Sequence, residues 1–171
     1  MNRKAFLVVW LCLFMFLFPK TPIIIENKIM AIAESTLNII VNFEGKRNKA
    51  YKDSRGLWTI GVGHLIKPNE QHLITAELTD KEVHELLRHD LNWCDEAVTS
   101  SVKVPLTQNQ YDALYSLCFN IGPNGFKTSR LVKALNAGDY KLAGQYFMDW
   151  VHPPELTNRR RQEKTLFLTD I

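Results

Sequence analysis

The sequence predicts an α+β domain, in which a small antiparallel sheet precedes a larger helical part. Turn residues and alternating side chains occur together only at residues 51–63. The segments after them carry apolar residues at helical spacing, several behind a capping residue. With 171 residues, of which 46% are hydrophobic, the chain can build one domain with a substantial core.

The first helix is expected at residues 33–44, because Leu37 and Ile40 are helically spaced and Gly45 follows where helices commonly end. Glu44 then lies in the last turn. The negative end of the helix dipole disfavours an ionised carboxylate there, and partial burial acts in the same direction. A general acid needs a protonated carboxyl group, so Glu44 is the candidate proton donor.

Residues 43–65 also hold a second acid and a hydroxyl. Asp53 lies nine residues after Glu44 and belongs to a turn. Thr59 lies six residues after Asp53, on the face of the expected strand 57–63 that carries glycines. Two carboxyl groups and a hydroxyl beside a groove suit glycosidic hydrolysis, since one acid protonates the leaving oxygen and the other prepares the nucleophile. The alternatives are an ordinary turn aspartate and a threonine chosen for strand propensity.

The later chain predicts a series of capped helices. Residues 68–70 indicate a loop, and a capping box follows it. A second capping box opens a helix that glycine and proline should stop at 122–123. The expected first residues of these helices, as caps or starts, are Thr79, Thr107, Ser129, Asp139 and Thr157.

The spacing of Glu44, Asp53 and Thr59, followed at once by Ile60-Gly61-Val62-Gly63-His64, resembles the catalytic signature of the phage-type lysozymes. These are the muramidases of glycoside hydrolase family 24, which phages use as endolysins. Later matches stand in the family's order over roughly residues 33–168. They are Phe119-Asn120-Ile121-Gly122, Gly125-Phe126, Ser129-Arg130-Leu131 and Asn158-Arg159.

This resemblance implies a lysozyme-like fold, with the active cleft between a sheet lobe and a helical lobe. It also implies hydrolysis of the β-1,4 bond between N-acetylmuramic acid and N-acetylglucosamine in peptidoglycan, and lysis of the host. Glu44 is the implied acid, while Asp53 with Thr59 holds the attacking water. That mechanism inverts the anomeric centre and needs carboxyl groups about 6.5–9.5 Å apart, whereas the residues alone leave a retaining mechanism open.

Further positions match family residues around the sugar. Leu65, Phe119, Asn120 and Ser129 are the implied substrate-binding residues, with core packing as the alternative for Phe119. A polar, glycine-containing loop at residues 120–125 could bind N-acetyl groups.

In the family, an arginine after an asparagine pairs with the catalytic glutamate, which here selects Arg159. The chain before it is two residues longer than the family pattern, so Arg160 is a competing choice. Arg160 and Arg161 are otherwise expected to form a solvated basic face or to contact peptidoglycan. His64 is expected to make a structural hydrogen bond or ion pair.

Composition limits the partners. The net charge of +3 suits an acidic polymer such as peptidoglycan, and no basic patch interleaved with aromatic residues points to nucleic acid. The five histidines have no metal-ligand spacing, so neither a metal nor a cofactor is expected. A monomer is expected. The rival functions are a peptidoglycan-binding module without catalysis, another glycosidase such as a chitinase, and membrane disruption.

Residues 1–32 are expected to be a signal or anchor segment with a linker, and residues 33–171 the catalytic domain. A basic start precedes an apolar run at 5–18, which is short for a membrane span and fits the core of a secretory signal. The interpretations are a cleaved signal, an uncleaved anchor in the inner membrane, or a core segment. The first two place the catalytic domain in the periplasm.

Three cysteines occur, Cys12, Cys94 and Cys118. The last two lie on apolar stripes of expected helices and are predicted to be buried thiols. A disulfide between them is the alternative in an oxidising compartment.

Overall fold

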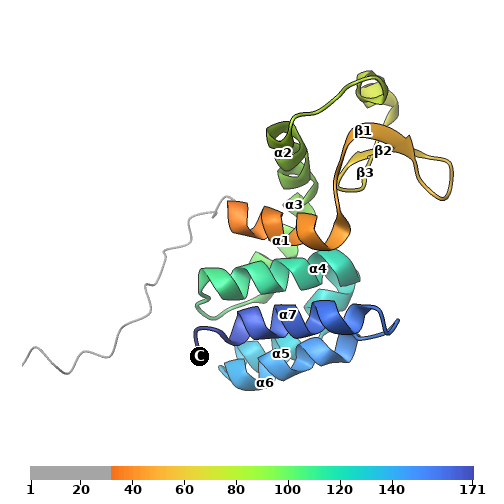
Figure 1. Cartoon of the computed structure of the whole chain (residues 1–171). Helices are drawn as coiled ribbons and strands as arrows, with labels where there is room; N and C mark the ends of the chain where they lie inside the picture. The colour runs from red at the N-terminus through yellow and green to blue at the C-terminus, as the bar shows by residue number, and fades with distance from the viewer. Residues whose placement is uncertain (1–31) are drawn as a thin grey trace, which may run out of the picture.

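The computed structural model describes residues 32–171, so the apolar run at 5–18 and Cys12 lie outside the described residues. Figure 1 shows a sheet at one end, a stack of helices at the other and α1 between them. The elements are α1 (Glu34–Glu44), β1 (Arg47–Lys52), β2 (Trp58–Gly61), β3 (His64–Leu65), η1 (Pro68–Ile74), α2 (Asp80–Asp90), α3 (Asn92–Ser101), α4 (Gln108–Thr128), α5 (Arg130–Asn136), α6 (Tyr140–Gln145), η2 (Tyr146–Trp150) and α7 (Leu156–Leu168).

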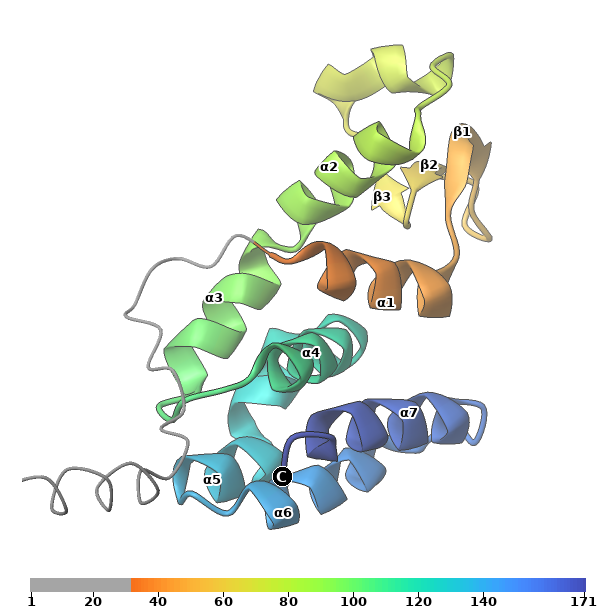
Figure 2. The same cartoon turned by 60° about the vertical axis from the view of Figure 1, so that its left-hand side comes forward.

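The predicted α+β architecture is confirmed. The three strands form one antiparallel sheet in the order β1-β2-β3. In Figure 2, α2 and α3 follow one another from the sheet end towards the stacked helices. In that stack, α4 packs against both α3 and α7. Within the described residues, none of the helices combines the length and apolar character needed to cross a membrane.

α1 ends where the sequence predicts. Gly45 follows it with φ of 76°, a conformation that glycine adopts without steric cost, and its N–H donates to the carbonyl of Val41. Leu37 and Ile40 are fully buried against the core. Because the helix stops at Gly45, Glu44 is held at its C-terminal end, beside the start of the sheet (Figure 1).

Both capping boxes are confirmed. The hydroxyl of Thr79 accepts from the N–H of Glu82 at 3.3 Å, and the Glu82 carboxylate accepts from the N–H of Thr79 at 2.7 Å. Thr107 and Gln110 repeat the arrangement at the start of α4, at 3.3 and 2.9 Å. Each box satisfies N–H groups that the first turn of a helix leaves without partners.

The structure differs from the expected elements in several places. The expected strand 57–63 is β2 only as far as Gly61, where a turn leads into β3. The sheet already begins at Arg47, and the loop predicted at 68–70 is part of η1. The helix behind Thr79 divides near Leu91 into α2 and α3.

The predicted stop at 122–123 is a kink rather than an end. Gly122 has non-helical angles (φ 79°, ψ 162°), and a second helical stretch runs from Pro123 to Thr128. Asn124 and Gly125 therefore lie in a helix, and the predicted polar loop is wrong. A Cβ atom on Gly125 would lie 3.2 Å from the Trp150 ring, so this stretch is packed closely against η2.

Cys94 and Cys118 are both buried and free, as the prediction of buried thiols requires, and the alternative disulfide is wrong. The Cys94 thiol donates to the carbonyl of Tyr115 at 3.5 Å. Burial raises its pKa above the ordinary value, because a thiolate is poorly solvated there. Both residues therefore act as small apolar side chains joining α3 to α4.

Candidate active site

Glu44 and Arg159 form an ion pair across the molecule. Nη1 of Arg159 donates to Oε1 of Glu44 at 2.5 Å, although the two residues are 115 positions apart. The Glu44 side chain is 31% exposed, whereas that of Arg159 is only 8% exposed. The carboxyl group is thus fixed on one side and open to solvent on the other. The structure pairs Arg159, rather than Arg160, with Glu44.

Arg159 is held by several groups besides Glu44. Its Nε donates to Glu163 at 3.0 Å, and its Nη2 donates to the carbonyl and hydroxyl oxygens of Ser116 at 3.0 and 3.3 Å. Its guanidinium carbon lies 4.7 Å from the ring centroid of Phe43, which precedes Glu44. This packing fixes the cation against the end of α1.

The prediction of a solvated face for Arg160 is wrong, whereas Arg161 is exposed as expected. Arg160 is fully buried and donates to Glu163, to the side-chain oxygen of Asn120 and to the carbonyl of Trp150. A cation in the first turn of α7 opposes the helix dipole. Glu163, one turn later, compensates both arginines.

Asp53 lies in the turn before β2. Its carboxylate accepts from the N–H groups of Arg55 and Leu57 at 2.8 and 2.9 Å, and from the Arg55 guanidinium at 3.0 and 3.1 Å. The N–H of Leu57 is the largest cause of a lowered Asp53 pKa, burial opposes it, and Arg55 adds to it. Asp53 is therefore both a turn residue and a carboxylate that is ionised at neutral pH.

Thr59 lies in β2, where it pairs with Tyr51 of β1 and Leu65 of β3. It is buried, and its hydroxyl donates to the carbonyl of Leu57 at 3.2 Å. The hydroxyl oxygen keeps its capacity to accept a hydrogen bond. Through Leu57, the backbone connects it with the turn that holds Asp53.

Comparison with known proteins decides the family. The model of the Phage lysozyme family matches residues 41–163, which include Glu44, Asp53, Thr59 and Arg159. The chain belongs to the phage lysozyme family.

Relatives and solved structures agree with this assignment. The endolysin of Salmonella phage P22 is 43% identical over 82% of this chain and 99% of its own length. The SAR-endolysin of Escherichia phage Mu is 33% identical over 78% of this chain and 79% of its own. A crystal structure of a P22 lysozyme mutant matches with a TM-score of 0.75 at 42% identity, covering 81% of this chain and 99% of that one. The muramidase domain of SpmX from Asticaccaulis excentricus matches with a TM-score of 0.67 at 38% identity, covering 80% of this chain and 97% of that one. The fold is therefore that of the lysozymes.

In this lysozyme fold, His64 ties the sheet to two other elements. Its Nδ1 lies 2.8 Å from Asp90 of α2, and its Nε2 lies 3.0 Å from Glu70 of η1. These are structural hydrogen bonds of the kind predicted for His64. In residues 32–171, no group of three or more potential metal-binding side chains occurs.

The four residues matched to the family's sugar-binding positions differ in accessibility. Leu65 is 43% exposed, while Phe119 is half-buried and stacks on Trp93 with ring centroids 6.1 Å apart. Asn120 is exposed but accepts from Arg160. Ser129 is buried, and its hydroxyl caps α5 by accepting from the N–H of Val132 at 3.2 Å. The side-chain oxygens of the last two thus already accept hydrogen bonds within the lysozyme.

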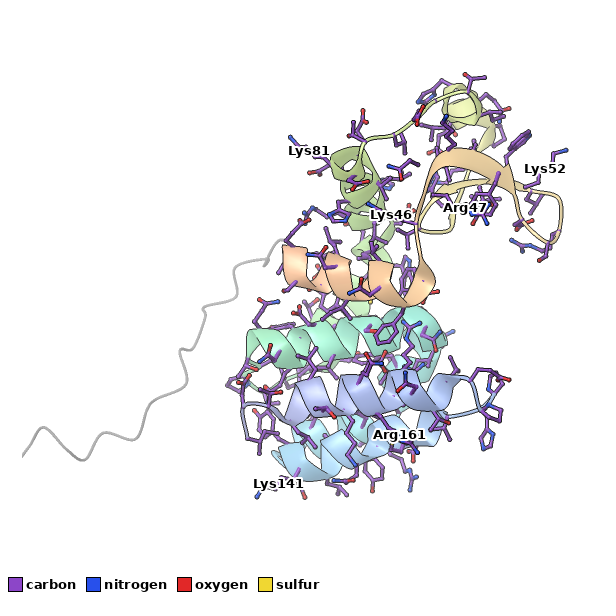
Figure 3. The ribbon with its side chains drawn as sticks, viewed as in Figure 1. Lys46, Arg47, Lys52, Lys81, Lys141 and Arg161 are labelled. Carbon is purple, nitrogen blue, oxygen red and sulfur yellow. The ribbon has the colours of Figure 1, made fainter. Side chains whose placement is uncertain are left out.

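Basic side chains gather around the sheet (Figure 3). Lys46 pairs with Asp80 at 2.5 Å. The Arg47 guanidinium lies over the Tyr51 ring, at 4.4 Å from its centroid. Lys52 lies over the Trp58 ring at 5.4 Å, and Trp58 is 38% exposed. This end of the lysozyme therefore presents positive charge together with an aromatic surface.

Three residues of the site are not predicted from the sequence: Ser116 and Glu163, which hold Arg159, and Trp93, on which Phe119 stacks. A signal for Glu163 was present, because it lies four and three residues after the two arginines on one helix. Nothing in the sequence near Ser116 distinguishes it from other serines on a buried helix.

Proposed function

We propose that this lysozyme-family chain is an endolysin that hydrolyses the β-1,4 bond between N-acetylmuramic acid and N-acetylglucosamine of bacterial peptidoglycan. The observation that carries the proposal is the Glu44 carboxyl group. A buried arginine fixes one of its oxygens, 31% of its side chain stays open to solvent, and it stands where the helical body meets the sheet. A proton donor needs this combination of fixed position and access.

In this mechanism Glu44 gives its proton to the leaving glycosidic oxygen. Asp53, ionised because backbone N–H groups hold its pKa low, is a weak base. It therefore acts mainly by orienting the water and by stabilising the positive charge that develops on the sugar ring. The Thr59 hydroxyl donates to Leu57, so its oxygen remains free to accept from the same water. Water attacks the anomeric carbon on the face opposite the leaving group, so the new C–O bond forms as the glycosidic bond breaks and the anomeric centre is inverted. The attacking water becomes strongly acidic as it bonds, and the Asp53 carboxylate takes its proton.

The test is release of reducing ends from purified peptidoglycan by the full chain, beside Glu44→Gln. We expect the variant to lose about two to four orders of magnitude in kcat, the range for removal of a general acid. Activity in both forms would mean that another residue is the acid. If the parent and Glu44→Gln both bind peptidoglycan without hydrolysing it, the binding-module alternative is favoured. If the parent hydrolyses chitin faster than peptidoglycan, the protein is a different glycosidase.

Inversion has its own test. The anomer released first, resolved by chromatography before mutarotation, is expected to be the α form from a β bond. A β product would replace single displacement by a covalent intermediate.

We further propose that residues 1–32 deliver residues 33–171 to the periplasm and tether them to the inner membrane as a monomer. The support is the apolar run at 5–18 behind a basic start. The similarity to a SAR-endolysin is in agreement with this. Full-length protein should sediment with membranes and give a monomer in detergent. Recovery of all the protein in soluble form, beginning near Ala33, would refute the tether.

A further inference from the structure

Glu163 is a buried carboxylate that the proposed hydrolysis does not use directly. Its side chain is only 1% exposed, yet it lies between two arginines of α7. Oε1 accepts from Nε of Arg159 at 3.0 Å and from the hydroxyl of Ser116 at 2.6 Å. Oε2 accepts from Arg160. Both of its oxygens are therefore occupied, and a carboxylate so deeply buried needs such partners.

These contacts set the direction of Arg159. The guanidinium is planar, so fixing two of its edges fixes the third. Glu163 holds Nε, and Ser116 holds Nη2. The remaining nitrogen, Nη1, then points at Glu44, where the distance is 2.5 Å.

The same contacts set the charge beside Glu44. Arg159 and Arg160 bring two buried positive charges, and Glu163 is the buried negative charge that touches both. Burial lowers the pKa of Arg160, and attraction to Glu163 opposes that effect. Without Glu163, two cations would face the single, partly exposed carboxylate of Glu44.

We infer that Glu163 is a positioning residue for the hydrolysis, which sets both the orientation of Arg159 and the net charge that Glu44 experiences. The inference rests on the proposed function, because it assumes that Glu44 is the proton donor. It adds a residue of α7 that does not touch the substrate but determines how readily Glu44 keeps its proton.

The charge argument predicts two opposite shifts. The charged groups of this cluster are Glu44 on α1 and Arg159, Arg160 and Glu163 on α7. The uncharged groups that face them are Ser116 and Asn120 on α4 and the carbonyl of Trp150 on η2. Glu163→Gln removes a negative charge, which favours ionised Glu44, so the alkaline limb of the kcat profile should move down by about one pH unit. Arg160→Met removes a positive charge and should move the alkaline limb to higher pH.

The orientation argument predicts an effect without a pH shift. Ser116→Ala keeps every charge and the carbonyl that accepts from Nη2, but it removes the hydroxyl that contacts both Nη2 of Arg159 and Glu163. The kcat should therefore fall several-fold while the alkaline limb stays in place. Glu163→Gln should lower kcat at neutral pH by about 10–100-fold with little change in KM, because it disturbs both orientation and charge. Glu163→Asp keeps the charge and should restore the alkaline limb.

A matched control separates these effects from loss of stability. Asp112 on α4 is 2% exposed and joins that helix to α1, by accepting from Thr36 at 2.5 Å near the start of α1; it also accepts from Gln108 of its own helix at 2.8 Å. Asp112→Asn makes the same carboxylate-to-amide change. It should lower the melting temperature and leave kcat and the alkaline limb of the folded protein unchanged.

The experiment measures reducing-end release by the full chain from pH 4 to about 10, for the parent, Glu44→Gln, the variants above and the control. Parent activity with loss in Glu44→Gln supports the proposed function independently of Glu163. An unaltered kcat and pH profile in Glu163→Gln would then overturn this inference alone, as would equal changes in Asp112→Asn. If Glu163→Gln does not fold, Arg160→Met provides the test. An upward shift of the alkaline limb in that variant supports the inference, and no shift overturns it. An inactive parent would instead refute the proposed function.

Discussion

Replacing Arg159 by Met should destabilise the protein by about 3 kcal/mol. Arg159 is 8% exposed and donates to Glu44, Glu163 and both oxygens of Ser116. Removing one partner of a buried ion pair costs about 3–5 kcal/mol, because the other charge loses its partner. The lower end of that range applies here, because Glu163 still pairs with Arg160 and the partly exposed Glu44 can be hydrated.

This loss should appear in both chemical and thermal unfolding. For a chain of this size, about 3 kcal/mol corresponds to a fall of about 6–12 °C in melting temperature. Arg159→Lys keeps the charge but not the planar fork, and should lie between the parent and the methionine variant. Circular dichroism in a urea series gives the free energy of unfolding directly, provided that the slope with denaturant is unchanged.

Arg161 supplies the matched control. It is the same residue type on the same helix (labelled in Figure 3), but it is exposed. Arg161→Met should change the free energy of unfolding by no more than about 0.5 kcal/mol. A loss below about 1 kcal/mol for Arg159→Met, or equal losses at both positions, would refute the argument that burial and pairing at Arg159 carry the energy.

Two further predictions concern packing and pH. A Cβ atom at Gly144 would lie 2.5 Å from Leu168 Cδ2 and 2.9 Å from its Cγ, so Gly144→Ala should lower the free energy of unfolding by about 1–3 kcal/mol in urea. Adding Leu168→Ala should cost less than the sum of the two single changes, whereas a stabilised Gly144→Ala would show that helix propensity outweighs the clash. Hydrogen bonds from the backbone N–H of Thr79 and, to a smaller extent, from its hydroxyl hold the pKa of Glu82 below its ordinary 4.5. The ionised carboxylate therefore stabilises the fold above pH 4.5, and this contribution is lost as the pH falls through the pKa that Glu82 has in the folded protein. The stability difference between the parent and Glu82→Gln should therefore be constant from about pH 7 to 5 and disappear towards about pH 2, and a pH-independent difference would contradict the assignment.

The sequence by itself determined the local devices. Thr79, Thr107, Ser129 and Asp139 each accept a hydrogen bond from a backbone N–H three residues later. Gly45 ends α1 and thereby puts Glu44 in its last residue position. Asp53 is held by groups two and four residues away. In each case both partners lie within one turn of chain, so residue type and spacing contain the whole interaction.

Only the tertiary structure decided which residues surround Glu44. Local patterns predicted a solvated Arg160, but packing of α7 against α4 and η2 buries it completely and pairs it with Glu163. After the kink at Gly122, α4 likewise continues as a helix, and Gly125 of this stretch lies against Trp150 of η2. The choice of Arg159 for Glu44 depends on the packing of α1, α4 and α7 together. Burial and pairing of charge arise from elements far apart in the chain, and no local pattern contains them.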